Sequence, residues 1–175
     1  MDKSVAQLIP SSAIKKVIQG LGTTISFDYK DRDLTVVCLL DGSLVFTANL
    51  LLQIKIPVNL FSIKVSSYIG KQSSGNVYCQ PIDLGFCKDK NILLIDDILD
   101  SGLTLSTMMH NIFLAGAKDV RTCVLLNKQV ERTEEINIIP NYKAFDIQNE
   151  FVVGYGMDYN GLYRNLPYIG VLQDK

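Results

Sequence analysis

One apolar run that ends in acidic residues constrains this chain more than any other feature. Residues Ile92 to Ile95 form an uninterrupted aliphatic run, the pattern of a strand that is covered on both faces. Asp96, Asp97 and Asp100 follow this run. Parallel sheets are built from such buried strands, and they bind ligands at the carboxyl ends of those strands. The segment therefore predicts an open α/β sheet with acidic side chains at its binding edge.

The residues after the third aspartate change from strand to helix periodicity. Apolar residues recur at helical spacing as far as Gly116, at Leu105, Met108, Met109, Ile112 and Phe113. Ser101, Gly102 and Thr104 therefore lie where a helix begins. The amino end of a helix offers unpaired N–H groups and a positive dipole, a glycine lets the backbone come close, and hydroxyl groups add donors. The turn is expected to bind a phosphate monoester.

Helix and strand patterns alternate along the rest of the chain, which favours a mostly parallel central sheet flanked by helices. A helix is expected after Ser11, which can cap it. A second helix is expected after residues 41–43, with Leu44, Ala48, Leu51 and Leu52 on one face. Further strands are expected at residues 34–40, 60–65, 120–126, 144–147 and 168–172. The chain has no repeat and no linker, so residues 1–175 predict a single domain.

Composition excludes several classes of protein. The chain has 17 basic and 18 acidic residues without a Lys or Arg cluster, so we expect no nucleic-acid or membrane surface. No apolar stretch approaches the ~18 residues of a membrane helix, and no leader pattern follows Met1, so a cytoplasmic protein is expected. Cys38, Cys79, Cys87 and Cys123 include no Cys-x-x-Cys pair, which argues against a zinc site.

The aspartates admit other interpretations. An Asp pair after a buried strand can hold magnesium beside a Walker-type loop, but the chain lacks the Gly-x-x-x-x-Gly-Lys-Ser/Thr sequence. Residues 96–100 also match the Asp-Asp-x-x-Asp box of isoprenoid diphosphate enzymes, whose boxes lie on long helices rather than after a strand. A lone Asp pair would be a solvated turn without function. The Ser101-Gly102 turn that follows favours a ligand site.

The same segment resembles a known signature. An apolar strand, two acids, two apolar residues, and Asp-Ser-Gly-x-Thr form the diphosphate-sugar motif of type I phosphoribosyltransferases, which residues 92–104 resemble. The segment 151–166, Phe-Val-Val-Gly-Tyr-Gly-Met-Asp-Tyr-Asn followed by Tyr-Arg-Asn-Leu, resembles the carboxy-terminal part of hypoxanthine-guanine phosphoribosyltransferases. Residues 39–43, 65–68 and 125–128 fall in the order of that family, so the resemblance covers roughly residues 11–172.

This resemblance implies a fold and an activity. The fold would be the type I phosphoribosyltransferase fold, with a small hood formed by the terminal segments. The activity would be purine salvage, in which the phosphoribosyl group of 5-phosphoribosyl diphosphate passes to hypoxanthine or guanine with Mg²⁺, giving IMP or GMP and diphosphate. A homodimer or homotetramer is expected. Xanthine as the base and a nucleotide-sensing regulator without activity stay open as alternatives.

The resemblance also implies roles for the residues around the phosphate turn. Asp96 and Asp97 would face the ribose hydroxyls and a magnesium ion. The sugar and its 5'-phosphate would be bound by the turn that follows, Ser101, Gly102, Leu103 and Thr104. Asp100 is the candidate that removes the proton from the purine nitrogen, because it lies between the two acids and the phosphate turn.

Diphosphate would be held by a second loop. Gly42 and Ser43 would supply backbone N–H groups and a hydroxyl, and Arg164 would contact the diphosphate. Asp41 stands where the family usually has Lys or Arg, so it adds repulsion unless it points away or helps to hold magnesium. The pair Ser67-Tyr68 resembles the signature of a lid that closes over the reacting centre, although an exposed loop would look the same.

The purine would be bound by residues from the last third of the chain. Lys128 would donate to the 6-oxo group, because an ammonium offers only donors and rejects a 6-amino group. Phe151 would stack on the purine, and the backbone of Val152 would contact its edge. Asp158 is expected at the purine site and on a magnesium ion of the diphosphate. Without the resemblance, Lys128 would be assigned to the surface, Phe151 to the core, and Asp158 with Arg164 to an ion pair.

Overall fold

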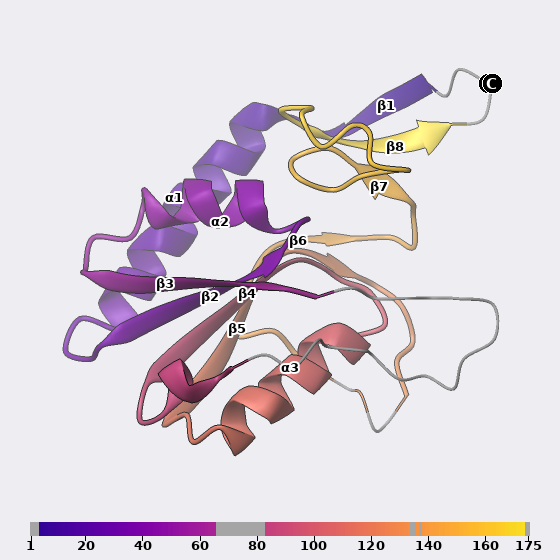
Figure 1. Cartoon of the computed structure of the whole chain (residues 1–175). Coiled ribbons are helices and arrows are strands. Elements are labelled where there is room, and N and C mark those ends of the chain that lie inside the picture. Colours follow the sequence, from indigo (N-terminus) through magenta and orange to yellow (C-terminus); the bar gives the residue numbers. More distant parts are fainter. Residues whose placement is uncertain (1–3, 66–82, 134–135, 137, 174–175) are drawn as a thin grey trace.

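The computed structural model describes residues 4–65, 83–133, 136 and 138–173. Within these residues a parallel sheet of five strands has the order β3-β2-β4-β5-β6 (Figure 1). Its strands are β2 (Leu34–Leu40), β3 (Val58–Lys64), β4 (Asn91–Leu99), β5 (Asp119–Lys128) and β6 (Tyr142–Ile147). All of them were predicted, with ends that differ by a few residues. The parallel pairing confirms the α/β class.

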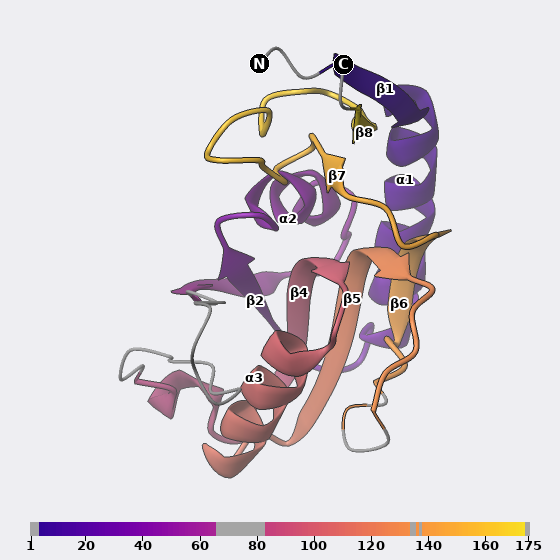
Figure 2. The same ribbon diagram turned by 90° about the vertical axis from the view of Figure 1, so that its right-hand side faces the viewer.

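Helices cover both faces of this sheet (Figures 1 and 2). They are α1 (Ser11–Asp28) and α2 (Leu44–Leu51) on one face and α3 (Leu103–Leu114) on the other, and a short 3₁₀ turn, η1, spans Gly85–Cys87. Along β4, Leu93 and Ile95 enter the core under α1 and α2, whereas Ile92 and Leu94 enter the core under α3. Alternation into two cores explains why residues Ile92 to Ile95 present no polar face. No described helix has the length and apolar character needed to cross a bilayer.

The apolar face predicted for α2 is mostly not the side that packs, since Leu51 alone of its four residues contacts the core. Phe46, Thr47 and Leu50 are the buried residues of this helix, whereas Leu44 and Leu52 are 55% and 74% exposed. The sequence of α2 is apolar on almost every side, so its periodicity does not identify the side that packs. The packed side is determined by the sheet beneath it, a contact that the local sequence does not encode.

The two ends of the described chain form a separate small sheet, the hood. In it, β1 (Ser4–Ile9) pairs with β8 (Ile169–Gln173), and β8 pairs with β7 (Val152–Val153), all antiparallel. The hood lies beyond α1 and α2, at the top of both views (Figures 1 and 2). This arrangement confirms the predicted hood, although β1 itself was not predicted.

Candidate active site

The acidic residues lie at the carboxyl edge of the sheet, but not as the sequence pattern predicted. The expected strand ended at Ile95, whereas β4 continues to Leu99 and includes Asp96 and Asp97. Its extension pairs with β5, with Ile98 opposite Leu126 and Leu99 opposite Asn127. The pairing partner thus carries the strand past the acids, which apolar periodicity does not reveal. Asp100 is the first residue beyond the strand.

Asp96 and Asp97 are adjacent carboxylates in a desolvated position. Burial raises the pKa of Asp96 well above its usual range, and the charge of Asp97 adds to this effect. Burial also raises the pKa of Asp97, opposed by hydrogen bonds from Asp96 and the Ile98 N–H and by the charge of Arg164. A cation beside the two carboxylates would compensate the repulsion between them. Paired carboxylate oxygens are also the ligands that Mg²⁺ prefers, so these residues fit a hard divalent cation.

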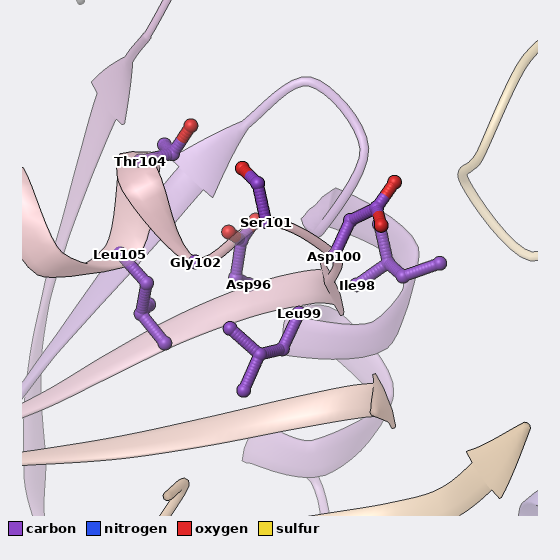
Figure 3. Close-up of a pocket in the computed structure, with 8 residues that line it drawn as sticks. All are labelled: Asp96, Ile98, Leu99, Asp100, Ser101, Gly102, Thr104 and Leu105. Carbon is purple, nitrogen blue, oxygen red and sulfur yellow. The ribbon is translucent and has the colours of Figure 1, made fainter. Parts of the chain in front are cut away.

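The predicted phosphate turn joins β4 to α3 and lines a small open pocket (Figure 3). Gly102 stands before the first residue of α3 with a left-handed backbone, φ 82°. The Oγ of Ser101 accepts the Leu103 N–H at 3.4 Å. Figure 3 shows the side-chain oxygens of Ser101, Thr104 and Asp100 on the same side of the turn. The turn therefore directs two hydroxyls and one carboxylate to the same side, beside the N-terminus of α3.

Asp100 and Lys128 are bound to each other. The Nζ of Lys128 lies 3.0 Å from Oδ2 of Asp100, which comes from the neighbouring strand end. The sequence suggested a lysine beyond the end of a strand, but Lys128 is the last residue of β5 and is buried. A buried ammonium held by one exposed carboxylate has the placement of a binding group rather than of a surface lysine.

The loop after β2 approaches the acids closely. A Cβ on Gly42 would collide with Oδ2 of Asp97, so any larger residue there would displace the Asp97 carboxylate. Asp41 is exposed and lies 3.6 Å from Nζ of Lys64, so its carboxylate has a cation partner. The hydroxyl of Ser43 is buried and donates to the Leu39 carbonyl. The loop can therefore offer its backbone to an anion, while the Ser43 hydroxyl is used inside the fold.

The segment after β7 closes over this loop. Arg164 pairs with Asp158 through an Nη2–Oδ1 distance of 2.8 Å and donates to the Gly156 carbonyl at 2.6 Å. A Cβ on Gly156 would collide with the Gly42 carbonyl, so the two loops are in contact. Asp158 also accepts the Gly161 N–H at 2.7 Å. The Asp158–Arg164 ion pair, which the sequence suggested without the family resemblance, is present, and it adjoins the predicted diphosphate loop.

A single cluster of metal ligands is not formed by the three predicted acids. In the parts of the chain that the structure describes, no three His, Cys, Asp or Glu side chains gather closely enough to hold one ion. Asp158 forms an ion pair with Arg164, whose charge also acts on Asp97. A metal role for Asp158 therefore stays a prediction of its own, separate from that of the other two acids.

The predicted base-stacking residue is available. Phe151 is 55% exposed, and its ring meets that of Tyr159 edge to face with centroids 5.7 Å apart. Val152, the next residue, is buried in β7. An exposed aromatic ring before a buried strand residue is free to stack on a planar ligand. The predicted lid residues, Ser67 and Tyr68, lie outside the described residues, as does Cys79.

Sequence reasoning missed Arg132 and its neighbours. The Arg132 guanidinium donates to oxygens of both strand ends that carry Asp100 and Lys128. It also donates to the Asn127 side chain, which in turn donates to Asp146 at 2.6 Å. Arg132 lies in a polar segment without periodicity, and only its spacing four residues after Lys128 could have drawn attention to it.

Comparison with known proteins agrees with this geometry. The family model described as phosphoribosyl transferase domain matches residues 4–160. A hypoxanthine-guanine phosphoribosyltransferase of Staphylococcus epidermidis is 38% identical over 95% of this chain and 92% of its own length. The hypoxanthine phosphoribosyltransferase of Escherichia coli K12 is 37% identical over 97% of this chain and 96% of its own.

Solved structures give the same result. A crystal structure of a hypoxanthine-guanine phosphoribosyltransferase from Bacillus anthracis has a TM-score of 0.89 and 32% identity, covering 99% of this chain and 100% of the other. Sequence and fold thus agree with these relatives along nearly the whole chain. The chain belongs to the phosphoribosyltransferase family, among the hypoxanthine-guanine phosphoribosyltransferases.

Proposed function

We propose that this chain salvages purines by transferring the phosphoribosyl group of 5-phosphoribosyl diphosphate to hypoxanthine, guanine or both. The products are IMP or GMP and diphosphate. The observation that carries the proposal is the Lys128–Asp100 pair, which places a donor for a 6-oxo group 3.0 Å from a carboxylate that can take a proton. Both residues adjoin the phosphate turn, so a base bound at Lys128 would lie beside the sugar.

The sugar phosphate is bound at one turn. The 5'-phosphate accepts hydrogen bonds from Ser101, Thr104 and the N–H groups at the start of α3, where Gly102 lets the backbone come close and Leu103 begins the helix. The ribose hydroxyls face Asp96 and Asp97, which β4 holds at a fixed position in the sheet. Fixing both ends of the ribose orients the anomeric carbon toward the base.

Base recognition and proton transfer are assigned to neighbouring residues. Lys128 donates to the 6-oxo group, Phe151 stacks on the ring, and the Val152 backbone contacts its edge. Asp100 takes the proton from the purine nitrogen as that nitrogen bonds to the sugar, so no charge builds on the base. A positioned carboxylate of this kind contributes about 10²–10⁴ in rate.

The leaving diphosphate binds at the loop formed by Asp41, Gly42 and Ser43. The backbone N–H groups of this loop and the Arg164 guanidinium donate hydrogen bonds to it. Phosphoribosyltransferases use a metal ion, and we propose Mg²⁺ here. When bound, the ion neutralises negative charge on the diphosphate. Asp96 and Asp97 would hold a metal ion on the ribose side, and Asp158, which is paired with Arg164, would hold one on the diphosphate side.

We further propose a single-domain, cytoplasmic enzyme that forms a homodimer or homotetramer. Supporting the assembly, large apolar side chains of this region are more than half exposed, namely Leu44 of α2, Leu52 just beyond its end and Leu60 of the outer strand β3. Monomeric proteins rarely leave many such side chains in water on one part of the surface. Light scattering of the purified protein checks this assembly.

Steady-state assays test the function. The wild-type protein is given 5-phosphoribosyl diphosphate and Mg²⁺ with hypoxanthine, guanine, xanthine or adenine. We expect nucleotide from hypoxanthine or guanine and none from adenine, because the Lys128 ammonium offers no acceptor to a 6-amino group. A protein that binds IMP but forms no nucleotide from any base would be a sensor rather than an enzyme.

A further inference from the structure

The Arg132 side chain joins the two strand ends that carry the proposed chemistry. Its Nε donates to the Asp100 carbonyl at 2.8 Å. Its Nη2 lies 3.0 Å from the Leu99 carbonyl, 2.7 Å from the Lys128 carbonyl and 3.2 Å from Oδ1 of Asn127. Each of these acceptors is an uncharged oxygen. The guanidinium therefore holds backbone geometry rather than balancing an acid.

These contacts begin where the sheet pairing stops. The last paired residues of β4 and β5 are Leu99 and Asn127. The carbonyls of Asp100 and Lys128 lie beyond this point, and Arg132 donates to both of them. Because a guanidinium is planar, one side chain fixes both strand ends in one plane. The strands are thereby held together one residue beyond their ladder.

A second layer of hydrogen bonds holds the arginine. Asn127 is buried, accepts from Arg132 and donates to Oδ1 of Asp146 at 2.6 Å. Asp146 also accepts from Gln129 at 2.9 Å and from Lys143 at 2.7 Å. Lys143 and the Asn127 amide also lower the pKa of Asp146, which keeps its carboxylate charged. The arginine is thus supported from β6 through β5.

We propose that Arg132 is a positioning residue that sets the distance between Lys128 and Asp100, and so aligns base recognition with proton transfer. The proposal rests on the proposed function. Arg132 acts on the reaction only through these two residues, because its hydrogen bonds go to the backbone and to Asn127. Displacement of reacting groups by about 1 Å can cost about 10²-fold in rate.

Arg132→Lys tests this role, because lysine keeps the charge and loses the planar fork. We expect kcat for IMP formation to fall by about 10²-fold, with the KM for 5-phosphoribosyl diphosphate changed by less than about twofold. Arg121→Lys is the matched control. Arg121 lies near the opposite end of β5, where it donates to the Tyr142 hydroxyl at 3.1 Å, so its replacement should leave kcat unchanged.

A double-mutant cycle separates positioning from general support of the fold. In an Asp100→Asn background, Arg132→Lys should cost no further kcat, because the group it aligns is already absent. Asn127→Ala removes the link to Asp146, so it should also lower kcat in the wild-type background and cause no further loss in the Asp100→Asn background. This variant replaces Arg132→Lys in the test if Arg132→Lys fails to fold.

The inference is overturned if Arg132→Lys retains the wild-type kcat, or if its loss is the same with Asp100 and with Asn at position 100. Absence of nucleotide formation by the wild type is a different result. It would overturn the proposed function, whereas a fully active Arg132→Lys enzyme would overturn only the positioning role.

Discussion

Lys128 Nζ and Asp100 Oδ2 lie 3.0 Å apart, so the residue proposed to read the base and the residue proposed to take its proton are bound to each other. Their side chains differ in exposure, 10% for Lys128 and 55% for Asp100. The lysine is enclosed by its surroundings, and the carboxylate is open to solvent. A 6-oxopurine that accepts from Lys128 would therefore compete with Asp100 and free its carboxylate for the purine proton.

Replacing Lys128 should affect one substrate more than the other. Lys128→Ala removes a charge-assisted hydrogen bond of about 1.5–3 kcal/mol, so the KM for hypoxanthine should rise by about 10–10²-fold. The KM for 5-phosphoribosyl diphosphate should change much less, because that substrate contacts the phosphate turn. Steady-state kinetics with each substrate varied in turn measures both values. An equal rise in the two would remove Lys128 from the base site.

The phosphate turn should not tolerate a side chain at position 102. Gly102 has φ 82°, and an added Cβ would lie 3.1 Å from Cγ2 of Ile136. Gly102→Val should therefore abolish measurable binding of IMP and of 5-phosphoribosyl diphosphate in calorimetry. Gly116→Ala, at φ 88° beyond the other end of α3, has similar backbone strain without touching the site. Its ligand affinity should stay at the wild-type level, and unchanged affinity in Gly102→Val would exclude the turn.

Asp41 should weaken the binding of diphosphate. The family resemblance implies a basic residue at this position, whereas the Asp41 carboxylate lies 3.6 Å from Lys64 at the surface. Removing the charge with Asp41→Asn should lower the KM for 5-phosphoribosyl diphosphate by about two- to fivefold, the effect of an exposed charge of about 0.3–1 kcal/mol. Asp31→Asn, on the exposed turn after α1, is the control. A higher KM in Asp41→Asn would instead show that the carboxylate helps to hold the metal ion.

Two glycines of α1 should respond in opposite ways. A Cβ on Gly20 meets nothing within 4 Å, so Gly20→Ala should raise the free energy of unfolding by about 0.5–1 kcal/mol. Gly22 is buried, and its added Cβ would lie 2.7 Å from the backbone carbon of Gln53. Gly22→Ala should destabilise the protein, since the backbone between α2 and β3 must move. Urea unfolding of both variants measures the difference, and equal stability would contradict the packing of α1.

The part of the site that follows from the sequence is the part that is contiguous. The run from Ile92 to Thr104 contains the strand, the acids, the turn and the helix start in order, so periodicity and turn chemistry locate these parts, although not the end of the strand. Residue roles at Lys128 and Phe151 came only from the family resemblance. Nothing in their local sequence distinguishes a binding lysine from a surface one.

Contacts between distant segments were not predictable from local pattern. Lys128 and Asp100 are 28 residues apart and meet because β4 and β5 are neighbours. The strand β1 exists through its pairing with β8 at the other end of the chain, and the length of β4 was set by β5. Arg132 is the clearest case, since its four acceptors come together only in the folded sheet.

Asp100→Asn tests the proposed chemistry most directly. The substitution keeps the size of the side chain and removes the base, so single-turnover formation of IMP should slow by about 10²-fold or more. Calorimetry on the same variant should find the affinity for IMP within a few-fold of the wild type. Asp97→Asn should instead weaken capture of the sugar diphosphate more than the later step. The decisive measurement is the single-turnover rate of Asp100→Asn with hypoxanthine and saturating 5-phosphoribosyl diphosphate: slow turnover with binding retained is the predicted result, and turnover at the wild-type rate would show that Asp100 does not take the proton.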